Sequence, residues 1–431
     1  MADVGEEDKF SSQSDRGGLE ADVQGIQSYF EKSRSVNLHI AVIGESGTGK
    51  STFINGLLGI GDGDDGKTET TLEPIMWKHP NKDTVKICEL PGTGDRKFLA
   101  SVYLDRVKFD QYDFFIILNN THFKQNDVNL AKEIHQRKKT CYFVRSKIDQ
   151  ELESVKGREK SKYNEGETLD RLRNDCVESL RKEGIKSPQV FLISSWYLDT
   201  FDFGKLQEVV GRDLPDLKRR LFLLSLPNIT SSIIEKKKEA MMDEIGKVAV
   251  LSAASVPIPG LTINCDIPLL VTNLSSYRTD LGLDNDSLGR LAKSVGKRME
   301  ELKSEVKSQF GVEVRDEVVR KVLIETGKEE ENVRRRFAQY LASAAPDIDP
   351  TSSYTNTCNV LETAVQEMVE DSKRVLRKGF QEGLIDRSRY RVSEDGALVF
   401  QSTSKAHHGR WTCVALNNIT QISTTTKVFV L

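Results

Sequence analysis

Residues 44–51 have the types and the spacing of a turn that binds a phosphate chain. They read GESGTGKS and match the pattern G-x-x-x-x-G-K-[ST] at every fixed position. Glycines let the backbone curl until successive N–H groups point at phosphate oxygens. Lys50 would reach the β- and γ-phosphates as a point charge, and the Ser51 hydroxyl would bind Mg²⁺. The spacing therefore predicts a site for a nucleotide with a phosphate chain.

A second motif, ELPG at residues 89–92, places a carboxylate where it could serve the same metal ion. Glu89 would hold Mg²⁺ through a water molecule, and the N–H of Gly92 would meet the γ-phosphate. Residues 61–74, which lie between the two motifs, are rich in glycine and aspartate. We expect a mobile loop there, in which Thr68, Thr70 or Thr71 completes the Mg²⁺ coordination. A solvated surface loop without such a role is the alternative.

The segment SKID at residues 146–149 resembles the [NT]-K-x-D motif with which GTPases recognise guanine. The Asp149 carboxylate would accept hydrogen bonds from N1–H and from the 2-amino group of guanine. Adenine lacks both donors and would leave a buried charge unpaired, so the discrimination would be large. The aliphatic part of Lys147 would lie over the base. Backbone N–H groups at Ser194 or Ser195, in the segment LISSW, could contact the guanine oxygen.

Together these motifs predict one nucleotide site and one set of catalytic groups. The predicted catalytic groups are Lys50, Glu69, Thr71, Glu89 and Gly92, and the predicted metal ligands are Ser51, Thr71 and Glu89. The predicted nucleotide contacts are Gly44, Glu45, Ser46, Gly47, Thr48, Gly49, Lys50, Ser51, Thr52, Ser146, Lys147, Asp149, Ser194 and Ser195. Mg²⁺ is the expected cofactor.

Alternating strand and helix signals between residues 36 and 215 would position these motifs. The strand signals are LHIAVIG, TVKICEL, DFFIIL, CYFVRS and QVFLISS, and helical stretches separate them. Such alternation predicts a parallel sheet with helices on both faces. Ligands of such a sheet bind at the carboxyl ends of its strands, where the motifs fall.

The character of the chain changes after Pro227, where helical signals continue to about residue 380. One apolar stripe contains Leu288, Leu291, Val295, Met299, Leu302 and Val306. Another contains Leu361, Ala364, Val365, Met368, Val369, Ser372, Val375 and Leu376. These spacings predict the core of a helical bundle. A short amphipathic helix at 19–34 could pack with it, so that both ends of the chain form one helical domain.

Composition narrows the classes of function. The chain has 431 residues, a net charge of −3 and six cysteines without a C-x-x-C pair. The absence of a basic excess argues against general nucleic-acid binding, and the cysteine spacing does not support a zinc or redox framework. No apolar run reaches the length of a spanning helix. Residues 248–271, interrupted by three prolines, predict a buried helix–turn–helix corner or, alternatively, a segment that touches a membrane.

With these residues in view, the chain resembles the immunity-related, interferon-inducible GTPases. The resemblance covers roughly residues 19–380. It rests on the segments GESGTGKSTFINGLLG, ETTLEP, ELPGTG, YDFFIIL, FVRSKID and SLPNITSSIIEKKK. It implies an α/β plus all-α fold: a Ras-like G domain (36–215) inserted into a helical domain (1–35 and 216–385). Lys50, Ser51, Gly92, Lys147 and Asp149 match nucleotide contacts of the family, and Glu69 and Thr71 match its first switch. Glu89 departs from the family's usual Asp.

The resemblance also implies what such a protein does. It implies GTP binding, GTP-dependent formation of homo-oligomers that stimulates hydrolysis, and action against intracellular pathogens. It further implies a cytoplasmic protein that associates reversibly with internal membranes as a peripheral protein. A GTP-gated binding scaffold with little turnover is the alternative, because Thr93 stands where small GTPases carry the Gln that orients the attacking water.

Residues 386–431 lie beyond this resemblance and are similar to the last strands of an immunoglobulin domain. HHGRWTC echoes the pattern D-x-G-x-Y-x-C, with His407 for Asp and Trp411 for Tyr. The tail is too short to bury the core of a sandwich by itself. It is either a β-rich remnant that lies on the helical domain or is tethered to it, or a module that recognises a partner.

Overall fold

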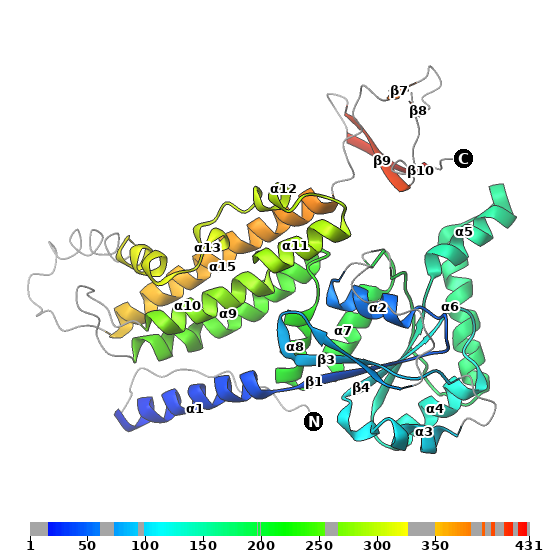
Figure 1. The fold of residues 1–431 in the computed structure, drawn as a ribbon, viewed down its shortest axis with the longest axis horizontal. Helices are drawn as coiled ribbons and strands as arrows, with labels where there is room; N and C mark the ends of the chain where they lie inside the picture. The colour runs from blue at the N-terminus through cyan, green and yellow to red at the C-terminus, as the bar shows by residue number, and fades with distance from the viewer. Residues whose placement is uncertain are drawn as a thin grey trace, which may run out of the picture.

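The computed structural model of the protein contains an α/β sheet and an elongated set of packed helices (Figure 1). It describes residues 16–60, 73–93, 99–195, 197–198, 200–254, 266–325, 350–380, 390–392, 398–400, 409–416 and 421–428. The predicted catalytic residues Glu69 and Thr71 lie outside the described residues, as do Thr68 and Thr70.

The sheet has the strand order β2-β3-β1-β4-β5-β6. Five of its strands pair in parallel, as predicted: β1 (Leu38–Ile43), β3 (Lys82–Glu89), β4 (Phe114–Asn119), β5 (Thr140–Arg145) and β6 (Val190–Leu192). The prediction of a wholly parallel sheet is wrong at one edge, where β2 (Ile75–His79) pairs antiparallel with β3. A tight turn is enough to connect two antiparallel strands, and no crossover helix is needed between them. The alternation of strand and helix signals therefore did not reveal β2.

Both faces of the sheet are buried, as the alternation along β1 demonstrates. Leu38, Ile40 and Val42 pack into one apolar cluster, whereas Ala41 and Ile43 pack into another. Successive side chains of a strand point to opposite faces, so each cluster lies on its own side of the sheet. This is the arrangement expected for strands buried on both faces, with helices covering each side.

Two groups of helices supply these clusters. The cluster on the first face contains side chains from α2 (Lys50–Leu58), α7 (Phe203–Asp213) and α8 (Asp216–Ser225). The cluster on the second face contains side chains from α3 (Ala100–Arg106), α4 (Gln125–Gln136), α5 (Ile148–Glu159) and α6 (Glu165–Lys182). The described residues of this part of the chain also contain two short 3₁₀ turns, η1 (Phe109–Gln111) and η2 (Lys160–Lys162).

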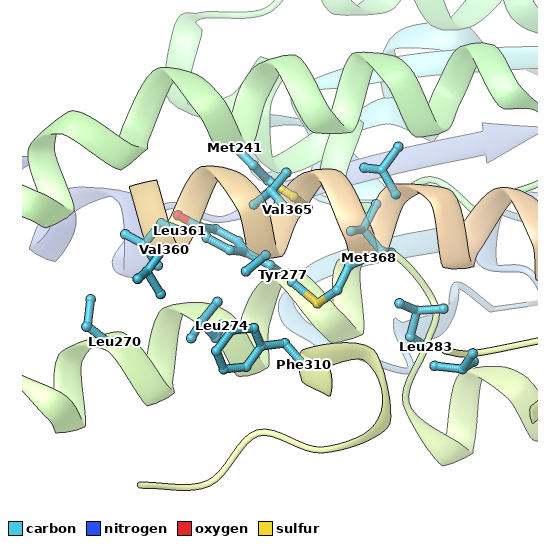
Figure 2. Packing of buried hydrophobic residues seen from close by; sticks show 14 of the residues in the cluster. Met241, Leu270, Leu274, Tyr277, Leu283, Phe310, Val360, Leu361, Val365 and Met368 are labelled. Carbon is cyan, nitrogen blue, oxygen red and sulfur yellow. The ribbon is translucent and has the colours of Figure 1, made fainter. Parts of the chain in front are cut away.

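A third apolar cluster lies between the helices after residue 230 (Figure 2). Its elements are α9 (Ser231–Ala253), α10 (Ile267–Asp280), α11 (Asn285–Ser294), α12 (Met299–Lys303), α13 (Gln309–Val312), the helical residues 316–325 and α15 (Pro350–Phe380). In Figure 2, Tyr277 and Leu274 from α10 face Leu361 and Met368 from α15. Every residue of the stripe predicted at 361–376 is buried, so that helix and its apolar face are confirmed.

The other predicted stripe, 288–306, does not form one continuous face. α11 ends at Ser294, Gly296 adopts a φ of 64°, and α12 begins only at Met299. A positive φ reverses the backbone at low cost only in glycine, and this glycine separates the two helices. The predicted corner at 248–271 falls on the end of α9 and the start of α10, and part of it lies outside the described residues.

The first helix, α1 (Arg16–Ser35), lies beside α9 (Figure 1). Phe30 packs against the third apolar cluster. Tyr29 donates a hydrogen bond from its hydroxyl to Glu244 Oε1 on α9 at 2.7 Å, and Arg220 on α8 pairs with the other oxygen of Glu244 at 2.5 Å. These contacts join the start of the chain to a helix more than 200 residues later.

Among the described residues, four strands follow α15. β7 (Tyr390–Val392) pairs antiparallel with β8 (Leu398–Phe400), and β9 (Gly409–Leu416) pairs antiparallel with β10 (Gln421–Val428). Within the described residues, no helix combines the length and the apolar character needed to cross a membrane. Four of the cysteines, Cys88, Cys141, Cys176 and Cys358, are free thiols.

Candidate active site

The glycine-rich turn connects the end of β1 to the start of α2. Gly47 and Gly49 have φ angles of 80° and 90°, which side chains with a Cβ rarely adopt. A Cβ at Gly44 would lie 2.3 Å from the carbonyl oxygen of Leu118 at the end of β4. The glycines are therefore required for two different reasons: a left-handed backbone at two positions, and a close approach to another strand at the third.

Lys50, Ser51 and Glu89 lie together at the start of α2 and the end of β3. The Ser51 hydroxyl donates a hydrogen bond to Glu89 Oε2 at 2.9 Å, and Lys50 Nζ lies 3.7 Å from Glu89 Oε1. Register explains the contact, because Glu89 pairs with Val42, two residues before the turn begins. Lys50 and Glu89 are both nearly inaccessible to solvent. Burial lowers the pKa of Lys50, and the charge of Glu89 partly opposes that shift.

The guanine-type motif is hydrogen-bonded to the same turn. Ser146 donates from its hydroxyl to the Thr48 carbonyl oxygen at 2.6 Å, and Lys147 Nζ donates to the Gly47 carbonyl oxygen at 2.8 Å. Lys147 precedes α5 with a left-handed φ of 57°, a conformation that non-glycine residues rarely adopt outside special sites. Two motifs almost one hundred residues apart in sequence therefore form one surface.

Asp149 lies in the first turn of α5, where the helix dipole favours a negative charge. Its Oδ1 atom is buried and has no hydrogen-bond partner among the described residues. A small hollow of about 40 Å³ beside this helix is lined by Gly49, Thr52, Ser146, Lys147, Gln150 and Ser195. Ser194 is fully buried and accepts a hydrogen bond on its hydroxyl from the Tyr197 N–H at 3.3 Å. Asp149 itself does not line this hollow. Its unpaired acceptor nevertheless has the chemistry needed to receive the N–H groups of a base.

The ELPG segment packs directly against the turn, since a Cβ at Gly92 would lie 3.3 Å from the Gly44 carbonyl oxygen. Thr93, which follows it, is fully buried. Its hydroxyl donates to Asp127 Oδ1 at 3.1 Å. The Thr93 hydroxyl is thus committed to a protein acceptor and points away from solvent.

The Interferon-inducible GTPase (IIGP) family matches residues 8–379. The chain belongs to this family. Its relatives include Interferon-inducible GTPase 5 of Bos taurus, 34% identical over 364 residues that cover 83% of this chain and 78% of the relative. Interferon-inducible GTPase 1 of Mus musculus is 33% identical over 374 residues, which cover 84% of this chain and 87% of the relative. Interferon-gamma-inducible GTPase 10 of Mus musculus is 38% identical over 299 residues, which cover 67% of this chain and 72% of the relative.

Solved structures similar to this GTPase include Toc33 from Arabidopsis thaliana and Aquifex aeolicus Era bound to GDP and AlF4⁻. Toc33 is 16% identical with a TM-score of 0.28, and the matched region covers 41% of this chain and 78% of the Toc33 chain. Era is 16% identical with a TM-score of 0.26, and covers 57% of this chain and 66% of its own.

Three polar residues of this GTPase were not foreseen from the sequence. The Asp127 carboxylate accepts three hydrogen bonds, one of them from Thr93 as described above. The other two come from the Asn119 side-chain amide at 3.1 Å and from the Lys124 backbone N–H at 3.0 Å. Desolvation raises the pKa of this buried carboxyl group. Lys124 also pairs with Glu45 of the glycine-rich turn at 2.5 Å. Asn119 closes β4, and the rule that ligands gather at strand ends could have singled it out.

Hard oxygen donors are available for the expected Mg²⁺. The Ser51 hydroxyl and the Glu89 carboxylate already share one hydrogen bond, and they lie beside the cation that would meet the phosphates. Mg²⁺ prefers one or two protein oxygens together with waters and substrate phosphates. The described residues fit that chemistry, and Lys50 would neutralise charge on the same side.

Proposed function

We propose that this chain binds GTP with Mg²⁺ and hydrolyses it to GDP and phosphate, with turnover stimulated by self-assembly. The observation that carries guanine recognition is the buried, unpaired Oδ1 of Asp149, whose sequence neighbours Lys147 and Gln150 line the hollow. GTP would satisfy this acceptor with N1–H and the 2-amino group, whereas ATP would leave it unpaired. An unsatisfied buried charge is costly, so the site should select GTP strongly.

The chain's own groups would then act on the phosphates. Backbone N–H groups of residues 44–49 would hold the β-phosphate, and Lys50 would approach the β- and γ-phosphates. When bound, Mg²⁺ would neutralise charge that develops on the phosphate oxygens. Ser51 would ligate the ion and Glu89 would orient one of its waters. Gly92 would offer its N–H to the γ-phosphate as hydrolysis proceeds.

Slow turnover by the isolated chain is part of the proposal. Thr93 cannot orient an attacking water while its buried hydroxyl donates to Asp127. A second copy would then supply or order the missing group, as trans-acting groups do in other GTPases. The same observation favours the second candidate function, a GTP-gated scaffold that hydrolyses little.

The domain organisation proposed for this function is a G domain at 36–215 inserted into a helical domain of 1–35 and 216–385, followed by an immunoglobulin-like tail at 386–431. Support for the insertion comes from the contacts of Phe30 and Tyr29 with elements after residue 216. Such an arrangement would let the G domain move helices that follow it and precede it in sequence.

Action at internal membranes against intracellular pathogens, from a cytoplasmic location, is proposed from the family alone. Without a spanning helix among those described, contact with a bilayer would be peripheral and reversible. The segment at 248–274 is the candidate contact. Flotation of GTP-bound protein with liposomes would support the proposal, and absence of flotation in every nucleotide state would oppose it.

Two measurements test the core of the proposal. Asp149→Asn should weaken GTP and improve binding of xanthosine triphosphate, because an amide can donate where xanthine presents a carbonyl. Equal affinity of the wild type for ATP and GTP would contradict the assignment of this motif. Lys50→Ala is the control for phosphate binding and should lose affinity for every nucleotide.

A concentration series separates the GTPase from the scaffold. Specific activity of the self-assembling GTPase should rise with protein concentration, and Lys50→Ala should remain inactive throughout. A flat rate near zero at all concentrations, with GTP bound, would favour the scaffold.

A further inference from the structure

A cavity of about 500 Å³ lies where the sheet meets the helices after residue 225, behind the nucleotide site. We call it the junction cavity. Its walls come from the end of α2, the β2–β3 turn, the segment between α8 and α9, and the facing sides of α9, α10, α11 and α15. Lys50, Ser51, Lys147 and Asp149 do not line it, but Thr52 and Ser195 line both this cavity and the hollow at the guanine-type motif, so it adjoins the proposed GTP site. Its volume is typical of sites for small organic molecules.

The charged groups around the junction cavity are unequal in sign. Lys82, Lys237, Arg290 and Lys293 line it, and the carboxylate among its lining residues is Asp280. Asp280 pairs with Lys82 at 2.5 Å. Among the described residues, no carboxylate lies within ion-pair distance of the other three cations. A cavity with this excess of positive charge favours an anion.

Two of these cations are held in place by neutral oxygens. Lys237 is 1% exposed, and its Nζ donates to the Leu226 carbonyl oxygen at 2.6 Å and to the Asp280 carbonyl oxygen at 2.8 Å. Arg290 Nη2 donates to Asn81 Oδ1 at 3.0 Å and to Ser287 Oγ at 2.9 Å. Burial lowers the pKa of Lys237 to about 7, so Arg290 is the permanently charged member of the two. Both are preorganised hydrogen-bond donors, because they lose little entropy when an anion arrives.

The rest of the wall is apolar, with Leu198, Leu291, Val375 and Phe380 among its side chains. Half of Phe380 is exposed, which leaves an aromatic ring at the edge of the cavity. Such a lining would stabilise the hydrocarbon part of a ligand whose charged end meets Lys237, Arg290 and Lys293.

We propose that the junction cavity is a binding site for a small phosphate monoester with an apolar body. Among the described residues, Lys82, Arg290 and Lys293 against the single carboxylate Asp280 leave an excess of two positive charges, which a dianionic phosphate balances better than a carboxylate does. Arg290 offers planar N–H groups suited to phosphate oxygens. Because the cavity contacts both α2 and the helices that follow the sheet, its occupant would bind where the two parts of the molecule meet.

Phenyl phosphate is the probe, measured by calorimetry on full-length protein saturated with a non-hydrolysable GTP analogue and Mg²⁺, which fills the β- and γ-phosphate positions of the proposed nucleotide site. Phenol has the same body without the charge, and inorganic phosphate has the charge without the body. We expect phenyl phosphate to bind at least tenfold more tightly than either. Failure of the GTP analogue to bind would be seen before the probe is added, so it is distinguishable from failure at the cavity.

Substitutions locate the binding. Arg290→Gln and Lys293→Gln should each weaken phenyl phosphate about tenfold, the effect of one lost charge-assisted hydrogen bond. Lys293 is exposed and its substitution spares the fold, which guards against misfolding of the Arg290 variant. Arg298→Gln is the matched control, because Arg298 is 80% exposed, pairs with Glu301 and does not line the cavity.

A separate arm of the same experiment tests whether the natural ligand is a lipid headgroup or a soluble molecule. Vesicles that contain phosphatidic acid present the same phosphate monoester on a membrane. Binding to such vesicles that Lys293→Gln weakens would assign the site to a lipid headgroup, and binding of phenyl phosphate alone would assign it to a soluble ligand. No saturable binding of phenyl phosphate, or equal binding by wild type, Arg290→Gln and Lys293→Gln, would overturn the proposal.

Discussion

Glu89 has a longer side chain than the aspartate that the family resemblance leads one to expect at this position. The structure shows where the additional methylene goes. The side chain is 4% exposed, and its carboxylate reaches the Ser51 hydroxyl at 2.9 Å while staying 3.7 Å from Lys50. A glutamate at this strand end can therefore contact Lys50 and Ser51, the two groups proposed to meet phosphate and metal.

Glu89→Asp tests whether this geometry is productive. Shortening the side chain moves the carboxylate by about 1.5 Å, one carbon–carbon bond. We expect the GTP hydrolysis rate at saturating Mg²⁺ to change less than tenfold, since a water molecule can span that difference. Glu89→Gln is the control and should lower Mg²⁺ affinity by removing the charge. A gain well above tenfold in Glu89→Asp would mean that the glutamate impairs the site.

At the scale of elements, the glycine-rich turn shows that glycines in one motif can meet different constraints. Gly44 leaves no room for a side chain, because a Cβ would lie 2.3 Å from a backbone oxygen of β4. Gly47 has open space around it but a φ of 80°. The first constraint comes from the packing of two strands, and the second from the path of the turn itself.

This difference predicts unequal effects of two alanine substitutions. Gly47→Ala should lower the free energy of unfolding by about 1 kcal/mol, the cost of a left-handed alanine. Gly44→Ala should cost about 3 kcal/mol, because β1 and β4 must move apart to relieve the overlap. Urea unfolding of nucleotide-free protein measures both. Equal losses would show that β4 yields easily and that the turn is not fixed by it.

At the scale of the whole molecule, the edge of the sheet is joined to the chain that leads into the helices. His79 at the end of β2 donates from Nε2 to the Ser225 carbonyl oxygen at 2.8 Å and accepts on Nδ1 from the Asn81 N–H at 3.1 Å. These two bonds require a neutral ring. Burial lowers the pKa of His79 to about 4, and nearby Lys237, Lys82 and Arg290 act in the same direction.

Acid should therefore weaken the folded state through His79. The unfolded chain binds a proton near pH 6.5 and the folded chain only near pH 4, so stability is full above 6.5 and falls as the pH drops. Between pH 7 and pH 5 the wild type should lose about 2 kcal/mol more unfolding free energy than His79→Gln. Identical losses in the two proteins would show that His79 titrates normally.

Removal of the tail tests the proposed domain boundary. Deletion of residues 386–431 should leave GTP affinity and assembly-stimulated hydrolysis within about twofold, because no predicted nucleotide contact lies there. Both are measured on the truncated and full-length proteins at matched concentrations. A tenfold loss in either would place the tail against a surface that the GTPase uses.

The sequence by itself determined the features that depend on local spacing. The glycine-rich turn, the parallel strands and the apolar face at 361–376 follow from residue types at fixed intervals, because backbone geometry repeats over a few residues. The motif positions also followed, since the carboxyl ends of parallel strands share one edge. The guanine-type motif could be recognised, although the unpaired oxygen of Asp149 could not.

Tertiary structure alone decided which distant groups meet. Local sequence does not indicate that β2 pairs antiparallel with β3 or that Glu89 contacts Ser51. The same is true of the hydrogen bonds that Asp127 accepts from Thr93 and Asn119. The junction cavity likewise forms from elements spread over most of the chain. A periodic pattern states which face of an element is buried, whereas the packing of whole elements selects what is buried against it.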